Sequence, residues 1–289
     1  MWLYWCLLST VIGGFTSVAL KKSSNNEPKR MAIIGLFLYN FIMFAVSLAI
    51  NPKFILELNI IHMLEMLPGL IMQSIGFYFV VSATKYGKVS ITSSVKKCNV
   101  VVVFLLGTIV LKEEFTILQI IISTLLLLLS IMLAKTKKES STIDKELERK
   151  SILCAFGYVL CNGISKTLNK VYVTSCGNPL YVIFNYAIIT IVVILIYCIV
   201  TRNLEYIDIR KINGKKYFIL QSIFDSTSSI FNRFAILDGN VSVISVIETS
   251  SIVITLLASR LILKEKISWK KYLAILGIFI CVLVLALIK

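Results

Sequence analysis

The residues of this sequence that could do chemistry are ionisable side chains inside long apolar stretches. Lys96, Asp225, Arg233 and Glu248 stand among runs of Leu, Ile and Val. A charged side chain at the centre of a hydrocarbon layer costs about 2.5–3.5 kcal/mol on insertion scales, so such residues usually face an internal polar space. A carboxyl group there can exchange a proton. An Arg offers a bidentate fork that suits an anionic or zwitterionic solute.

Lys96 and Glu248 hold equivalent positions in a repeated sequence, because residues 87–114 align with residues 239–266 at a constant offset of 152. Each residue lies about 12 Å into its apolar stretch at 1.5 Å per residue. If the two stretches enter a ~30 Å hydrocarbon core from opposite faces, the two charges differ in depth by about 6 Å. The sequence therefore predicts a central pair between Lys96 and Glu248. Two readings stay open: a pair that a solute or proton opens, and a purely structural ion pair. Lys97, about 100° round the helix, is a weaker candidate.

Polar residues on the same helical faces extend this site. Asp225 and Arg233 lie two turns apart, about 12 Å along one helix, so they need partners on other helices. Arg233 could instead extend towards the helix end as a snorkelling side chain, as we expect of Lys170. The candidate solute-binding or ion-binding residues are Lys96, Asn99, Tyr158, Asn162, Lys166, Asp225, Arg233 and Glu248.

The elements that carry these residues are membrane-spanning segments. The 289 residues are 57% hydrophobic and 16% charged, and the mean hydropathy is +0.88, whereas soluble domains are about 45–50% apolar. A bilayer span needs about 20 apolar residues. The sequence predicts ten spans, at residues 2–20, 31–50, 64–84, 89–111, 116–134, 151–173, 180–201, 217–237, 241–263 and 272–288.

The repeat divides these spans into two halves. Residues 1–134 form the first five-helix repeat, residues 135–150 a basic and polar linker, and residues 151–289 the second repeat. Because five is odd, the second half enters the bilayer with the opposite orientation. The expected fold is an all-α polytopic membrane protein with ten transmembrane helices as two inverted five-helix repeats, an architecture typical of carriers with a midplane site.

The distribution of charge predicts the orientation. Of the 30 Lys and Arg residues, which give a net charge of +15, 21 lie in the odd-numbered connections between spans. This pattern marks those connections as cytoplasmic and places both termini outside. It also explains the basic character without nucleic acid as a partner. The seven Cys form no CxxC pair and His62 is the single histidine, so we expect no metal site and no cofactor.

The two halves resemble a known family. Each has a penultimate span that ends in the sequence Leu-Lys-Glu, at 111–113 and 263–265, followed by a hydrophobic final span. This arrangement is similar to that of the EamA-type drug/metabolite transporter superfamily and covers essentially the whole chain. The resemblance implies ten helices and transport of metabolites, amino acids or drugs, in a bacterial inner membrane. It also implies that both termini lie in the cytoplasm, which conflicts with the orientation that the charge distribution predicts. We expect the orientation from the charge distribution, with both termini outside.

The expected function is secondary, ATP-independent transport of a small organic solute by alternating access around a midplane site, with protons as a candidate coupling ion and a homodimer left open. A non-transporting membrane scaffold or accessory subunit is the alternative. An intramembrane enzyme is weaker, because the sequence contains no GxSxG, HExxH or P-loop motif. The protein is therefore not expected to be an enzyme.

Overall fold

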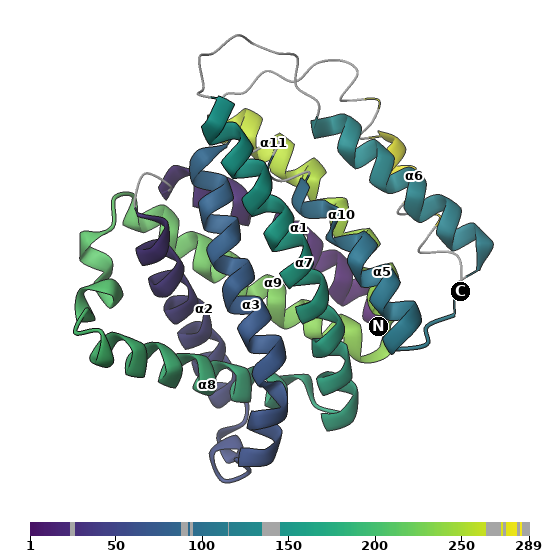
Figure 1. Cartoon of the computed structure of the whole chain (residues 1–289). Helices are drawn as coiled ribbons and strands as arrows, with labels where there is room; N and C mark the ends of the chain where they lie inside the picture. The colour runs from purple at the N-terminus through teal and green to yellow at the C-terminus, as the bar shows by residue number, and fades with distance from the viewer. Residues whose placement is uncertain are drawn as a thin grey trace.

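A computed structural model describes residues 1–23, 27–87, 92, 95–114, 116–134, 145–263, 273, 276–281 and 284. Within these residues the chain is built of helices packed side by side (Figure 1). The helices are α1 (Trp2–Ser23), α2 (Pro28–Ile50), α3 (Ile60–Tyr86), α5 (Asn99–Val110), α6 (Ile117–Ala134), α7 (Lys145–Cys176), α8 (Pro179–Val200), α9 (Lys215–Asp238), α10 (Val241–Thr249) and α11 (Ser251–Leu263). Short 3₁₀ turns occupy Pro52–Ile55, Leu204–Ile207 and Ile209–Lys211.

Each of the first nine predicted spans overlaps a described helix, and the tenth, 272–288, falls mostly outside the described residues. Among the described residues, six helical segments are long and apolar enough to cross a bilayer. The chain is therefore a multi-pass membrane protein. The linker residues 135–144 also lie outside the described part.

Local sequence signals set several helix boundaries. Asn178 precedes α8, and its Oδ1 accepts hydrogen bonds from the N–H groups of Leu180 and Tyr181 at 3.0 and 3.4 Å. Pro179 stands at the first helical position, where its fixed φ suits a helix and its missing N–H has no intrahelical acceptor. Asn59 caps α3 in the same way, by accepting from the Ile61 N–H at 2.9 Å.

Four helices meet at one end of the molecule, which we call the basic end. Lys21, in the last turn of α1, donates to the carbonyl of Gly87 directly after α3, at 2.9 Å. Lys22 donates to the Tyr217 hydroxyl at the start of α9 at 3.2 Å. Ser151, near the start of α7, donates to a carbonyl in the last turn of α3 at 2.9 Å. The ends of α1 and α3 and the starts of α7 and α9 therefore lie together.

At the other end of the molecule, which we call the opposite end, the start of α1 lies with the ends of α7 and α9 and the start of α10. Lys170, near the end of α7, donates to the carbonyl of Gly239 directly after α9, at 3.1 Å. The carboxylate of Glu113 accepts from the N–H of Val241 at the start of α10, at 2.7 Å. Trp2, at the start of α1, packs beside Gly239. Since α1 starts at this end and α7 finishes here, α1 and α7 run in opposite directions.

Two of the predicted spans, 89–111 and 241–263, are interrupted at equivalent positions. Residues 95–97 are helical, Cys98 is a turn, and α5 begins at Asn99; likewise α10 ends at Thr249 and α11 begins after Ser250. At both positions backbone N–H groups donate to the carbonyl three residues earlier, as in a 3₁₀ turn. In the first half Cys98 donates to Val95 and Val101 to Cys98, both at 3.0 Å. In the second half Ser250 donates to Ile247 at 3.0 Å and Val253 to Ser250 at 2.9 Å. These four bonds coincide at the offset of 152.

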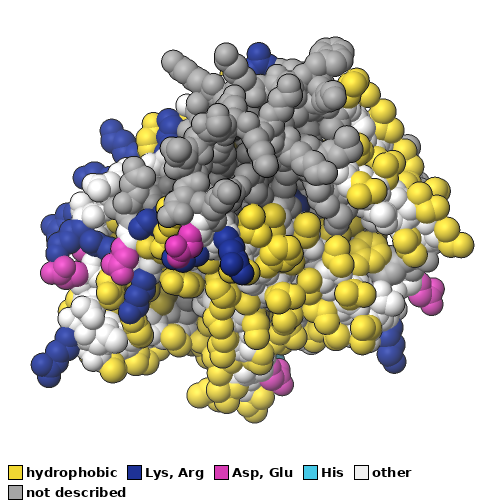
Figure 2. Space-filling view, turned by 45° about the horizontal axis from the view of Figure 1, so that its top comes forward, with side chains coloured by type: hydrophobic (Ala, Val, Ile, Leu, Met, Phe, Trp, Pro, Cys, Tyr) yellow, Lys and Arg dark blue, Asp and Glu magenta, His cyan; other side chains and the backbone are white. Residues whose placement is uncertain are grey.

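Apolar side chains cover the outside and also fill the contacts between helices. Leu105, Ile109, Ile121 and Leu195 are among many exposed apolar residues, and Figure 2 shows a broad hydrophobic surface with most of the visible Lys and Arg gathered on one side. Such a surface suits lipid rather than water. A buried apolar cluster that includes Tyr186 fills the space between the helices near the opposite end.

Candidate functional site

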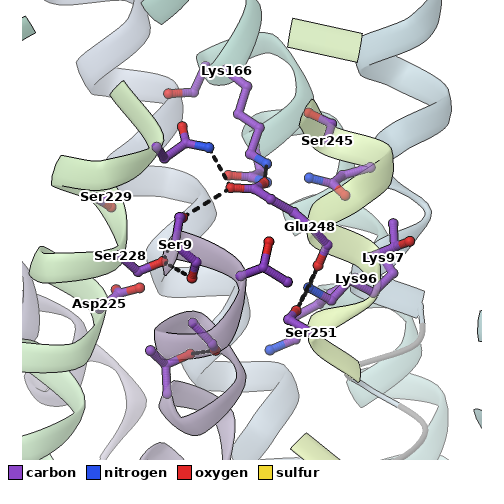
Figure 3. A pocket seen from close by; sticks show the side chains of 18 of the residues that line it. Ser9, Lys96, Lys97, Lys166, Asp225, Ser228, Ser229, Ser245, Glu248 and Ser251 are labelled. Carbon is purple, nitrogen blue, oxygen red and sulfur yellow. Dashed lines mark hydrogen bonds and ion pairs between the residues drawn. The ribbon is translucent and has the colours of Figure 1, made fainter. Parts of the chain in front are cut away.

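All eight predicted site residues line one cavity of about 220 Å³ in the middle of the helix bundle. Its walls come from α1, α7, α9, α10 and the residues on both sides of the two helix interruptions (Figure 3). The predicted residues that it brings together are Lys96, Asn99, Tyr158, Asn162, Lys166, Asp225, Arg233 and Glu248. Whether they bind a solute stays a prediction.

The carboxylate of Glu248 is the centre of the polar contacts in this cavity. Lys166 of α7 forms an ion pair with it, and the side-chain amide of Asn232 on α9 donates to it. Ser9 of α1 donates from its hydroxyl at 3.4 Å. The Lys166 and Glu248 side chains are only 20% and 16% exposed. Three helices are therefore tied to one carboxylate on α10, as Figure 3 shows.

The predicted pair between Lys96 and Glu248 is wrong, because Lys166 is the partner of Glu248. The ammonium of Lys96 instead donates to the Ser17 hydroxyl at 3.4 Å and lies 5.9 Å from the centre of the Tyr158 ring. The depth of a residue along a helix follows from its rise per residue. The direction of its side chain depends on how the helix is rotated about its axis, and depth alone does not determine that rotation.

Lys97, the weaker candidate, lies where the two interrupted helices meet. Its ammonium donates to the Ser251 hydroxyl at 2.5 Å and to the backbone carbonyl of Glu248 at 3.1 Å. Sequence reasoning did not select Ser251 or Ser9. The repeat could have found Ser251, since it stands at the position equivalent to Asn99 at the offset of 152.

A second cavity of about 160 Å³ continues the first towards the basic end. The two share several lining residues, among them Tyr158, Asn162 and Asp225. The second cavity is also lined by Leu20, two residues before Lys22, and by Gln221 in the first part of α9. Asp225 and Lys96 line both cavities. The polar interior therefore extends in one direction, towards the basic end.

Arg233 lies inside the cavity wall, so the alternative that it snorkels to the helix end is wrong. The residue is 4% exposed, and its guanidinium lies 5.1 Å from the centre of the Tyr186 ring. The Nε and Nη1 atoms are buried without a hydrogen-bond partner. A charged donor that is desolvated in this way is costly unless something pairs with it.

The snorkelling expected of Lys170 is also wrong. Its ammonium donates to the backbone carbonyls of Ile236, Leu237 and Gly239, at 2.6, 3.2 and 3.1 Å. These are the unpaired carbonyls at the end of α9, where a positive charge is favourable. The carboxylate of Glu113, in the Leu-Lys-Glu sequence of the first half, accepts hydrogen bonds at the start of α10, the helix that follows α9. The turn between α9 and α10 is therefore held from both sides.

The helices that form the cavity approach one another at glycines. A Cβ atom on Gly14 of α1 would lie 2.6 Å from the Ile254 side chain of α11. A Cβ atom on Gly163 of α7 would lie 2.6 Å from the Val102 side chain of α5. Both separations are far below ordinary van der Waals contact, so only glycine fits at these two crossings.

The cavity offers charges and hydrogen bonds for a small polar solute. Among the described residues, no group of three or more His, Cys, Asp or Glu is placed to hold a metal ion. The seven cysteines are free thiols. What the arrangement provides is a set of four cationic side chains and two carboxylates in one space.

These features define a multi-pass helical membrane protein with a charged internal cavity. The EamA-like transporter family model matches residues 1–136 and 149–287, and the chain belongs to this family. Twenty-eight chains of solved structures also match. One, titled "Crystal structure of protein", has a TM-score of 0.72 and 14% identity over 98% of this chain and 96% of that chain, and so shares the fold. No curated protein sequence matches.

Proposed function

We propose that this protein is a secondary transporter that moves a small organic solute by alternating access, with the 220 Å³ cavity as the binding site. The observation that carries the proposal is the contact set of Glu248, whose carboxylate joins side chains of α1, α7 and α9. A solute or proton that competes for this carboxylate would change how three helices are held together. That is the coupling between binding and conformation that transport needs.

Equivalent contacts in the two halves support an inverted-repeat mechanism. Lys21 and Lys170 bind the carbonyls of Gly87 and Gly239, which are equivalent at the offset of 152. The helix interruptions coincide at the same offset, and α1 and α7 run in opposite directions. Discontinuous helices that meet near the midplane of two inverted repeats form the binding sites of many carriers. We therefore propose the ten-helix inverted arrangement for the whole chain.

The position of the cavity suggests which state the structure represents. The polar space continues towards the basic end, while the apolar cluster around Tyr186 and the contacts of Lys170 and Glu113 close the opposite end. Basic ends of membrane proteins face the cytoplasm. We propose an inward-facing state with both termini outside. A C-terminal reporter that is active in the cytoplasm would contradict this orientation.

Solute counterflow in proteoliposomes tests the function without assuming an energy source. We expect the wild-type protein to exchange a radiolabelled solute drawn from a panel of amino acids, organic acids and organic cations. Glu248→Gln should abolish this exchange while the protein still inserts. Glu205→Gln is the matched control, because Glu205 is an exposed carboxylate paired with Lys211 outside the cavity. Normal counterflow in Glu248→Gln would contradict the proposal.

The alternative of a non-transporting scaffold makes a different prediction. A scaffold would keep its cellular phenotype when the cavity charges are removed together, by replacing Lys96, Asp225, Arg233 and Glu248. A transporter would lose it. The same four-fold variant thus separates the two classes of function.

A further inference from the structure

The cationic side chains of the cavity differ in how they are paired. Lys166 forms an ion pair with Glu248. Lys97 is bound to the Ser251 hydroxyl and a backbone carbonyl. Lys96 donates to Ser17 and interacts electrostatically with Asp225. Since four cationic side chains stand with two carboxylates, the lining carries a formal excess of two positive charges.

Arg233 differs from the three lysines, because part of its hydrogen-bonding capacity is unused. It is 4% exposed, and Nε and Nη1 have no hydrogen-bond partner. The ring of Tyr186 covers the guanidinium at 5.1 Å, and such a contact stabilises a cation without using its N–H groups. Nε and Nη1 lie on different edges of the guanidinium, and each edge is completed by Nη2; the two N–H groups of either edge match two oxygens of a carboxylate or phosphate.

A second unused polar group lies at a similar depth. Ser245 is 2% exposed, lines the cavity, and its Oγ has no hydrogen-bond partner. It lies four residues from Val241, where α10 begins at the opposite end, which is about 6 Å along the axis. Arg233 lies five residues before the end of α9 at Asp238, which is about 7.5 Å. Both groups therefore lie near the end of the cavity that is closed, towards the opposite end of the molecule; we call this part the closed floor of the cavity.

We propose that Arg233 binds an oxyanion, a carboxylate or phosphate group of the transported solute, at the closed floor of the cavity, with Ser245 as a further donor. This inference rests on the proposed transport function. The oxyanion would satisfy Nε or Nη1, with Nη2 as the second donor of the same edge, and neutralise part of the excess positive charge. The rest of the solute extends towards Asp225, eight residues and about 12 Å nearer the basic end. A positively charged group on the solute would meet the carboxylates there.

Ligand binding to the purified protein in detergent tests the subsite directly. Isothermal titration with inorganic phosphate, succinate and choline chloride, at equal ionic strength, compares two oxyanions with a cation. We expect one oxyanion to bind and choline not to bind, and the oxyanion that binds identifies phosphate or carboxylate as the preferred group. Loss of a charge-assisted hydrogen-bond pair weakens binding by roughly 10–100-fold. We expect that loss in Arg233→Gln.

Two further variants make the result specific. Arg210→Gln removes an equal charge from an exposed side chain outside the cavity and should leave binding unchanged. Arg233→Lys keeps the charge without the fork and should bind with intermediate affinity, and this variant serves if Arg233→Gln does not fold. If neither oxyanion binds, or if Arg233→Gln and Arg233→Lys both bind as the wild type does, the subsite proposal is overturned.

Counterflow measured on the same preparations keeps the two proposals separate. Solute exchange that is insensitive to Arg233→Gln, in a protein that binds no oxyanion, would overturn the oxyanion subsite and leave transport standing. Oxyanion binding that depends on Arg233, in a protein that exchanges none of the panel solutes, would support the subsite and overturn transport.

Discussion

The pairing of Glu248 can be measured with two double-mutant cycles. One cycle combines Lys166→Met with Glu248→Gln, and the other combines Lys96→Met with Glu248→Gln. The structure pairs Glu248 with Lys166, whereas Lys96 contacts Ser17 and Tyr158. The two lysines are the same residue type in the same cavity, so each cycle is the control for the other.

The expected sizes follow from burial and from the remaining partners. The Lys166 and Glu248 side chains are 20% and 16% exposed, and removing one member of a buried pair destabilises a protein by about 3–5 kcal/mol. Lys166→Met leaves the carboxylate with Asn232 and Ser9 as donors, so it should cost less than Glu248→Gln, which leaves the ammonium without its anion. We expect a coupling energy of about 1.5–3 kcal/mol for Lys166 with Glu248 and no more than about 0.5 kcal/mol for Lys96 with Glu248.

The assay is unfolding by SDS in mixed micelles, followed by circular dichroism, with the free energy of unfolding compared across the four proteins of each cycle. A larger coupling energy for Lys96 than for Lys166 would refute the pairing and restore the pair that the repeat alone suggests. Near-additive behaviour in both cycles would show that the carboxylate is held by its neutral donors.

Three further predictions concern groups around the cavity. Arg233→Met should raise the free energy of unfolding of the empty protein by about 1–3 kcal/mol, because two unpartnered donors cost more than the aromatic contact returns; a loss of stability would reveal a structural partner. Glu113→Gln should lower stability by about 1–2 kcal/mol and speed amide hydrogen exchange at Val241, whose N–H it binds; unchanged exchange would contradict this cap. Gly14→Ala should destabilise more than Gly13→Ala, because the new Cβ lies 2.6 Å from an α11 side chain at Gly14 but 3.0 Å from a rotatable hydroxyl at Gly13; equal thermal unfolding temperatures would contradict the tight crossing.

The membrane-spanning helices were predictable because their signal is local. A run of about 20 apolar residues identifies a span whatever surrounds it, and each of the first nine predicted spans overlaps a described helix. The interruptions at Cys98 and Ser250 were not predicted. Neither position carries Pro or Gly, the residues that usually mark a broken helix. At the second interruption the hydroxyls of Thr249, Ser250 and Ser251 each donate to a carbonyl three residues back, and such side-chain bonds often bend helices.

The set of cavity residues was predictable, but their partners were not. Ionisable groups in apolar helices usually face inwards, and that rule selected Lys166 and Asp225 together with Glu248. Which lysine reaches the carboxylate depends on the rotation and crossing of the helices that carry them. Lys170 shows the same difficulty, since its place near a helix end gave no indication that the end of α9 lies beside it.

Two residues that form contacts between helices are the same in both halves, while a residue that faces the cavity differs. At an offset of 149, α1 and α7 share Gly14 with Gly163 and Lys21 with Lys170, whereas Ser17 is replaced by Lys166. The shared residues make equivalent contacts. A scaffold with equivalent contacts in each half can exchange two conformations of similar energy. A cavity lining that differs between the halves can present the same asymmetric arrangement of charge to an asymmetric solute in both conformations. Lys166 can pair with Glu248 because α7 carries a lysine at the cavity-facing position where α1 carries Ser17.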